Sequence, residues 1–404
     1  MPADREAAIR EITDWAVAQA LCEVDMERLF TGVCDRLSEA GIPIRRAHLA
    51  VRTLHPLVEA VGFRWWRGQA PEQMTHRRTE EPSLEWEQSP LKRLEESGDT
   101  ELRISLEGEA GEWRDFPLLV DLRNCGITDY YCRLSFFGSE ARARRHQDGM
   151  IVSWSTDQPG GFSDDDLAAL RRVQDRLAVG VKMAKREQTA LNVLTAYLGA
   201  DAGRRVLEGQ IQRGDGELLH AVIWYSDLRG STPLADRIGG VRFLALLNDY
   251  FECTASAVLD HGGEVLRFIG DAVLAIFKVE GPGGEQRAAR MAMAAAKDAE
   301  KRLERLNEKR ALRNEEPLDF GLALHVGEVL FGNVGVPERF DFTAVGPAVN
   351  EAARLEGLTK TLERRIVVSN AFSSLLPLEW ESLGETALRG VETGRRVYAP
   401  PLAE

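Results

Sequence analysis

Two aspartates lie at the ends of apolar, strand-like stretches in the C-terminal half of the sequence. Asp227 follows an apolar run at 221–226, and Asp271 lies inside a second run at 265–277. Carboxylates held at the ends of neighbouring strands could bind divalent cations beside a polyphosphate. Each aspartate alone has a simpler interpretation, because Asp is common in helix caps and hairpin turns. The two together favour a two-cation site for phosphoryl transfer.

The residues after Asp227 could bind the phosphates themselves. Gly230, Ser231 and Thr232 precede Pro233, where a helical pattern begins. The first turn of a helix leaves backbone N–H groups unpaired, and these groups bind anionic oxygens. We therefore expect these three residues to contact the substrate.

A third motif follows these two in the chain, Thr343-Ala-Val-Gly-Pro-Ala-Val-Asn-Glu-Ala-Ala-Arg-Leu-Glu356. With all three motifs in this order, the sequence from about 219 to 398 resembles the class III adenylate and guanylate cyclase catalytic domain. The resemblance implies that the ribose 3′-hydroxyl of a nucleoside triphosphate attacks the α-phosphate, releasing pyrophosphate. It also implies two Mg²⁺ or Mn²⁺ ions per site and a homodimer with shared sites.

The resemblance assigns a role to each motif residue. Asp227 and Asp271 would hold the cations, with help from the backbone carbonyl of Leu228. Asn350 would orient the ribose and Arg354 would contact the α-phosphate. These last two residues are four apart, so in a helix they share a face. The alternative for Arg354 is a solvated charge on the surface of a helix.

The base-reading residues depart from the family's pattern. Family members that use ATP have a Lys and an Asp or Thr, whereas guanylate cyclases have Glu and Cys. This chain has Arg267 and Thr343 at these positions. Arg267 can donate to adenine, but its planar fork also matches guanine, so ATP is preferred and GTP remains open. Arg339 and Arg389 lie where the family often has triphosphate contacts.

Composition sets the broad class. The 404 residues are 44% hydrophobic and 28% charged, which is typical of a soluble globular protein long enough for two domains. A formal net charge of −13 argues against a nucleic-acid partner. No apolar stretch approaches the roughly 20 residues of a membrane span. The five cysteines form no Cys-x-x-Cys pair, which favours buried free thiols and a cytoplasmic location.

The N-terminal half has a mixed α/β pattern. Helical spacing extends over 5–40, strand patterns occur at 47–53, 130–138 and 149–156, and 74–97 is expected to form exposed loops or a lid. Ser163 should cap a long helix that continues to Leu198. That helix resembles the closing helix of a GAF-type sensory domain. A small-molecule ligand and a purely structural, dimerising role both remain open for this half, and Trp65 and Trp66 are either strand aromatics or a ligand-contact patch.

These patterns divide the chain into a GAF-like domain at 1–190, a helical linker at 191–218 and a catalytic domain at 219–404. In the catalytic part we expect strands at 219–226, 318–325 and 328–332 and a hairpin at 265–277. Helices are expected at 234–261, 285–313 and 347–356. This order predicts an α+β fold with a ferredoxin-like βαββαβ sheet. The competing hypotheses are an adenylate cyclase, a guanylate cyclase and a catalytically dead sensory or dimerising module.

Overall fold

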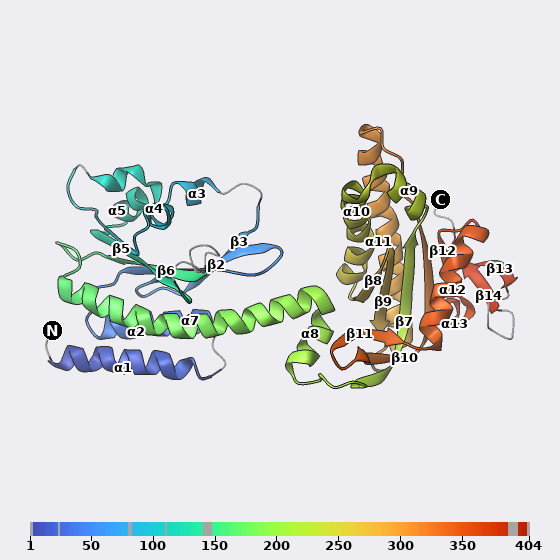
Figure 1. The fold of residues 1–404 in the computed structure, drawn as a ribbon, viewed down its shortest axis with the longest axis horizontal. Coiled ribbons are helices and arrows are strands. Elements are labelled where there is room, and N and C mark those ends of the chain that lie inside the picture. The colour runs from blue at the N-terminus through green and yellow to red at the C-terminus, as the bar shows by residue number, and fades with distance from the viewer. Residues whose placement is uncertain are drawn as a thin grey trace. The chain divides into compact units, whose positions relative to one another are not determined.

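The computed structural model describes residues 3–22, 25–79, 83–109, 111–139, 148–386 and 395–401. The chain divides into two compact units, Met1–Ala196 and Tyr197–Glu404 (Figure 1). Within the described ranges, no helix is long and apolar enough to cross a membrane. The five cysteines are free, and Cys22 and Cys125 are exposed rather than buried as expected.

The N-terminal unit is built on one antiparallel sheet of six strands in the order β3-β2-β1-β6-β5-β4. The strands are β1 (Arg46–Arg52), β2 (Val58–Trp66), β3 (Glu72–Arg77), β4 (Glu101–Ser105), β5 (Asp129–Phe136) and β6 (Gly149–Thr156). One face packs on α1 (Ala3–Gln19), α2 (Met26–Glu39) and α7 (Asp164–Leu198). Alternate side chains of β1 and β6, such as Leu49 and Trp154, point to this face and supply its apolar core.

A second, smaller core covers part of the other face. It includes side chains from α4 (Pro90–Ser97), the 3₁₀ turn η1 (Glu112–Asp115) and α5 (Pro117–Asn124), with Trp86 of α3 (Leu84–Glu87) at its margin. The expectation of loops over 74–97 was therefore wrong. Ser83 and Ser89 cap α3 and α4 through their side chains, and Leu91 and Leu94 are buried.

Two other expectations for this unit are resolved by the structure. The single helical stretch expected over 5–40 is two helices, because the side chain of Asp25 caps a new start at α2. Trp65 is a buried strand aromatic whose Nε1 donates to Asp35 Oδ1 at 2.8 Å, and Trp66 is only partly buried in the same strand.

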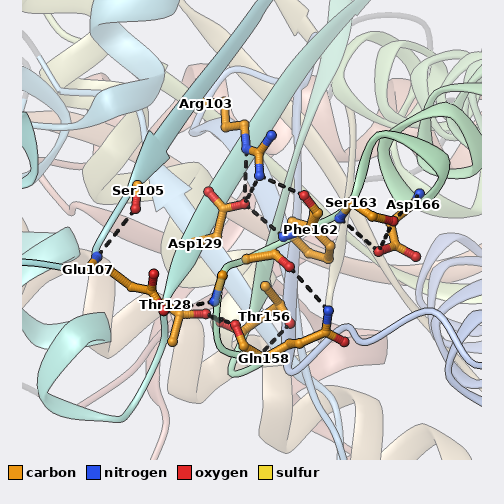
Figure 2. A network of polar contacts seen from close by, with 12 residues as sticks. Arg103, Ser105, Glu107, Thr128, Asp129, Thr156, Gln158, Phe162, Ser163 and Asp166 are labelled. Atoms are coloured by element: carbon orange, nitrogen blue, oxygen red, sulfur yellow. Dashed lines mark hydrogen bonds and ion pairs between the residues drawn. The ribbon is translucent and has the colours of Figure 1, made fainter.

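The start of α7 is fixed by a network of polar contacts (Figure 2). Ser163 caps the helix, since its Oγ accepts from the backbone N–H of Asp166 at 3.2 Å, as the sequence predicted. Asp129 of β5 accepts from Arg103 Nε and from the backbone N–H of Phe162, both at 3.0 Å. Gly161 has φ +76°, and a Cβ there would lie 2.6 Å from Asp129 Oδ2. The loop before α7 is therefore held tightly against the sheet.

The C-terminal unit contains an eight-stranded sheet in which β13-β14-β12-β10-β7-β9-β8 lie in order and β11 pairs with β10. The strands are β7 (Gly216–Leu228), β8 (Glu264–Ile269), β9 (Ala272–Lys278), β10 (Phe320–Val336), β11 (Arg339–Val345), β12 (Ile366–Ser369), β13 (Glu381–Thr386) and β14 (Arg395–Ala399). The first four strands along the chain lie in the order 4-1-3-2. This is a ferredoxin-like βαββαβ core within an α+β fold, as predicted from the sequence.

Helices cover both faces of this sheet. Alternate residues of β7 and β9 pack on α10 (Gly240–Asp260) and α11 (Gly284–Leu312). The intervening residues of β7 and β9 point to the opposite face, where they pack on α8 (Ala200–Leu207), α12 (Pro347–Thr361) and β11. A short helix, α13 (Asn370–Ser373), follows β12.

Three elements differ from the sequence-based expectation. The expected strands at 318–325 and 328–332 form one strand, β10, because Gly327 keeps its pairing with Ala221 of β7. The expected helix at 234–261 is broken at Gly239, which has φ +79° and separates α9 (Ser231–Ile238) from α10. The helical linker expected at 191–218 is the end of α7 followed by α8, and its last three residues already belong to β7.

Candidate active site

Strand register brings the two sequence-predicted aspartates together. Asp227 is the penultimate residue of β7 and pairs with Gly321 of β10 and Ala272 of β9. Asp271 immediately precedes Ala272, in the hairpin turn where Gly270 has φ 64°. Type I′ and II′ hairpin turns need a positive φ, which glycine adopts without strain. The turn therefore places Asp271 beside the end of β7.

The electrostatics of this pair are unfavourable without a cation. Burial raises the pKa of Asp227, and hydrogen bonding and repulsion from Asp271 raise it further, against the opposing charge of Lys360. When both carboxyls are ionised neither can donate a hydrogen bond, and the buried Oδ2 of Asp271 has no donor. A positively charged ligand would compensate both carboxylates.

Helix α12 packs closely on the strand beside Asp227. A Cβ at Gly321 would lie 2.3 Å from both Glu356 Oε1 and Thr359 Oγ1, so only glycine allows this approach. Glu356 is 5% exposed, and burial raises its pKa, with the charge of Asp271 acting in the same direction. Sequence reasoning missed Gly321 and Glu356 as part of this region, because their proximity depends on how the helix packs on the sheet.

Arg229 fixes the chain just after the site. Its Nη1 lies 2.9 Å from Asp319 Oδ2, and its Nη2 donates to the carbonyls of Thr359 and Arg364 at 3.3 and 2.9 Å. It thus ties the end of β7 to the C-terminal end of α12. This role could not be predicted from the sequence, because the residues that Arg229 contacts are 90 or more positions away.

The expected phosphate-binding residues begin helix α9. Gly230 is the N-cap, with φ 68°, and no side chain caps the helix. Ser231 and Thr232 are its first residues, and Pro233 has no N–H to offer. The backbone N–H groups of Ser231 and Thr232 are thus the donors that this helix start can supply. Leu228, the expected carbonyl ligand, has a side chain that is 1% exposed and packs in the core.

Asn350 and Arg354 lie on the surface of helix α12. Both are exposed on α12, whereas Ala348, Ala352 and Leu355 of the same helix are buried. No hydrogen bond or ion pair joins Asn350 or Arg354 to Asp227 or Asp271 among the residues that the structure describes. Within the described residues, one chain thus brings the two carboxylates into contact, while Asn350 and Arg354 make no hydrogen bond or ion pair with them.

The expected base-reading residues lie on two strands in contact. Arg267 of β8 forms an ion pair with Asp341 of β11, with Nη2 3.0 Å from Oδ2. Thr343 is two residues beyond Asp341, so the two side chains leave β11 on the same face. Thr343 is 5% exposed and pairs with Gly332 of β10. Asp341 was missed in the sequence because only the pairing of β11 shows that it reaches Arg267.

The other two residues expected to contact the phosphates are Arg339 and Arg389. Arg339 is exposed at the first position of β11. Arg389 lies outside the described residues.

The carboxylate pair fits a hard divalent cation. It offers carboxylate oxygens only, one of them buried and without a partner, which is the donor type that Mg²⁺ and Mn²⁺ prefer. Within the described ranges no cluster of three or more His, Cys, Asp or Glu side chains is placed to hold a metal. Mg²⁺ is commonly bound by one or two carboxylates and completed by substrate phosphates. Asp227 and Asp271 would therefore hold cations together with a triphosphate.

Comparison with known proteins places residues 218–399 in one family. They match the sequence model of the adenylate and guanylate cyclase catalytic domain. An uncharacterised protein of Mycobacterium tuberculosis is 33% identical over 245 residues, 59% of this chain and 43% of the relative. An adenylate cyclase of Anabaena cylindrica is 30% identical over 165 residues, 40% of this chain and 32% of the relative.

The chain spans less than half the length of these curated relatives. Among solved structures, it is similar to the adenylyl cyclase CyaB from P. aeruginosa, with 24% identity, 47% of this chain and 97% of that chain covered, and a TM-score of 0.43. Residues 218–399 of this chain therefore belong to the class III adenylate and guanylate cyclase catalytic domain family.

Proposed function

We propose that the C-terminal unit converts ATP to 3′,5′-cyclic AMP and pyrophosphate. The observation that carries the proposal is the pairing of Asp227 with Asp271, which places two carboxylates side by side and leaves a buried oxygen without a donor. Mg²⁺ or Mn²⁺ ions held there would neutralise triphosphate charge and lower the pKa of the ribose 3′-hydroxyl. The family of residues 218–399 supports this chemistry.

The other residues act on the nucleotide. The N–H groups of Ser231 and Thr232 bind phosphate oxygens at the start of α9, as helix starts bind anions. Asn350 holds the ribose so that its 3′-oxygen faces the α-phosphorus. A bond forms between these two atoms and the bond to pyrophosphate breaks. Arg354 stabilises the charge that develops on the α-phosphate oxygens.

The location of Asn350 and Arg354 supports a homodimer with shared sites. Both are exposed on α12, and among the described residues no hydrogen bond or ion pair joins them to the carboxylates of their own chain. In the proposed assembly, each site takes Asp227 and Asp271 from one protomer and Asn350 and Arg354 from the other. Two-fold symmetry then gives two equivalent sites.

Two nucleotides, ATP and GTP, are candidates for the substrate. Thr343 supports ATP, whereas the planar fork of Arg267 favours GTP as the second candidate because it matches the O6 and N7 acceptors of guanine. Incubation of the purified chain with Mn²⁺ and either ATP or GTP, followed by identification of the products, tests both candidates. Formation of neither cyclic nucleotide would support the third hypothesis, a catalytically dead module.

We further propose that residues 1–190 form a GAF-like regulatory domain, that 191–218 form a helical linker and that 219–404 form the catalytic domain of a cytoplasmic enzyme. The support is the six-stranded antiparallel sheet with α1, α2 and α7 on one face and smaller helices on the other. Deleting 1–190 should change the rate of cyclic nucleotide formation but not which nucleotide is used.

A further inference from the structure

One face of the N-terminal sheet carries buried polar side chains from four adjacent strands. Arg46 and His48 of β1 pair in register with Ser155 and Ser153 of β6. The neighbouring strands add Tyr130 of β5, opposite Ser155, and Arg64 of β2, opposite His48. Alternation puts all six on the face opposite α7. We call this set the β1 polar cluster: Arg46, His48, Arg64, Tyr130, Ser153 and Ser155.

Several atoms of the cluster are buried without a hydrogen-bond partner. These atoms are His48 Nε2, Arg64 Nε, Tyr130 Oη and Ser155 Oγ. Burial raises the pKa of Tyr130, and the nearby Ser153 acts to lower it. The hydroxyls of Tyr130 and Ser153 nevertheless do not meet hydrogen-bond geometry. Buried polar groups in folded proteins are almost always paired. Four unpaired atoms on one face therefore indicate that a partner binds there.

Arg46 indicates the charge that such a partner would carry. It is 3% exposed. Among the described residues, its guanidinium makes a long hydrogen bond from Nη1 to Ser153 Oγ at 3.5 Å and lies 5.9 Å from the centroid of the Trp66 ring. No ion pair joins it to a carboxylate among the described residues. Burial lowers the pKa of Arg46 to about 10, so it is still a cation at neutral pH. An uncompensated buried charge is costly.

Three other charged residues of the same unit have a partner of opposite charge, unlike Arg46. Asp129 on β5 is 1% exposed and forms an ion pair with Arg103, whose Nη2 lies 2.8 Å from Asp129 Oδ2 (Figure 2). Within the cluster, Arg64 forms an ion pair with Glu72, with Nη1 3.2 Å from Oε2. Arg45, next to Arg46, lies 3.7 Å from Asp157. Water could satisfy the hydroxyls and the imidazole, but it could not neutralise Arg46.

We propose that the β1 polar cluster binds a small organic anion through a carboxylate or phosphoryl group. The guanidinium fork of Arg46 takes the anionic group in two parallel hydrogen bonds. Tyr130 and Ser155 supply hydroxyls to the same group or to its neighbour. Burial and the charge of Arg46 lower the pKa of His48, so its imidazole is neutral and can donate or accept. The six-stranded sheet is then a ligand-binding domain, independent of the proposed cyclase activity.

The test compares two neighbouring arginines in the full 404-residue chain. Arg46→Met removes the unpaired cation, and Arg45→Met is the matched control because it removes a partly exposed arginine that already has a carboxylate. Thermal unfolding is measured with increasing inorganic phosphate or acetate against chloride at constant ionic strength. Tryptophan fluorescence reports mainly the N-terminal unit, which holds six of the eight tryptophans: Trp15, Trp65, Trp66, Trp86, Trp113 and Trp154.

Wild type and Arg45→Met should gain a saturable rise in Tm of a few degrees, roughly as ligand linkage predicts. Arg46→Met should lose that rise. A response to phosphate alone would assign a phosphoryl ligand, and a response to acetate alone a carboxylate ligand. Equal shifts in the two arginine variants, or no saturable shift in wild type with either anion, would overturn the proposal.

Two further measurements separate a ligand site from a structural cation. In chloride, Arg46→Met should unfold at the same temperature as wild type or higher, because it removes an uncompensated buried charge. Failure to fold, or a Tm lowered by several degrees, would mean that Arg46 is already paired and would count against the site. Tyr130→Phe removes a single oxygen and should halve the anion-induced shift while leaving the Tm in chloride unchanged. An undiminished shift would remove Tyr130 from the site.

Discussion

At the scale of single residues, Asp227 and Asp271 repel each other unless a positive charge compensates them. Asp227→Ala or Asp271→Ala should lower turnover with Mn²⁺ and ATP by more than about 100-fold, because each variant removes a metal ligand. The Tm of the metal-free protein should be unchanged or higher, since a repulsive partner is gone. Product formation and thermal unfolding are the two measurements. Near-normal turnover in either variant would rule out the two-cation assignment.

Arg267 and Thr343 allow a test of base selection. Arg267→Lys should keep ATP as the substrate, because a lysine can also donate to adenine. The double variant Arg267→Glu with Thr343→Cys should shift the preference toward GTP. The ratio of kcat/KM for ATP and GTP is the measurement. An unchanged ratio in the double variant would mean that other residues read the base.

Asp341 adds a prediction that the sequence alone did not suggest. Its ion pair with Arg267 orients the guanidinium over β11. Both partners are exposed by more than 40%, so the pair adds little stability. Asp341→Asn should therefore leave the Tm within about 1 °C of wild type but alter the ATP-to-GTP ratio of kcat/KM. A ratio identical to wild type would show that Arg267 does not depend on this contact.

Which residues could be predicted depends on how local their signal is. Asp227 and Asp271 were found because each ends an apolar strand and stands beside glycine-rich turns. Gly321, Arg229 and Asp341 were not, because their roles arise from contacts between segments far apart in the chain. A glycine inside a strand does not reveal in the sequence that a helix packs against it.

At the scale of elements, strong local patterns predicted the fold. The hairpin around Gly270 and the alternation of strands and helices yielded the ferredoxin-like order. The errors came where tertiary contacts decide. Gly327 lies inside β10 because β7 pairs along its whole length. Residues 216–218, expected in the helical linker, begin β7 because they pair with residues 330–332 of β10.

Helix α8 is held to the sheet by an ion-pair network. Asp201 Oδ2 lies 2.6 Å from Lys278 Nζ and 2.9 Å from Arg205 Nε. Burial acts to raise the pKa of Asp201, but the hydrogen bonds from Lys278 and Arg204 outweigh it and lower the pKa to about 2. A carboxyl whose folded pKa is depressed stabilises the fold above its unfolded pKa, near 3.8, and loses that contribution as the pH falls toward 2.

Asp201→Asn should therefore lower the Tm of the C-terminal unit by a few degrees at pH 7. The difference from wild type should shrink as the pH falls from about 4 toward 2. Arg204→Ala is the matched control, since Arg204 contacts the same carboxyl but is 64% exposed. Its Tm should change by less than about 1 °C. A pH-independent difference for Asp201→Asn would show that the ion pairs do not account for the stability.

At the scale of the whole molecule, the proposed site draws its residues from two chains. The carboxylates lie where β7 meets the hairpin, and Asn350 and Arg354 are exposed on α12. The sequence shows that all four residues are present but not which surfaces they share. Symmetry is the simplest way for one chain to complete its own site, since a two-fold axis brings each half to the other.

Mixing two inactive variants tests that assembly. Asp227→Ala and Arg354→Ala homodimers should each be inactive, because every site lacks one part. In a mixed dimer one site carries both lesions and the other carries neither. Random exchange makes about half of the dimers mixed, and each mixed dimer has about half of its sites intact, so activity should return to at most about one quarter of wild type. Tagged chains that co-purify after mixing demonstrate exchange. If exchange occurs and the mixture stays inactive, Asp227 and Arg354 act within one chain and the shared-site assembly is wrong.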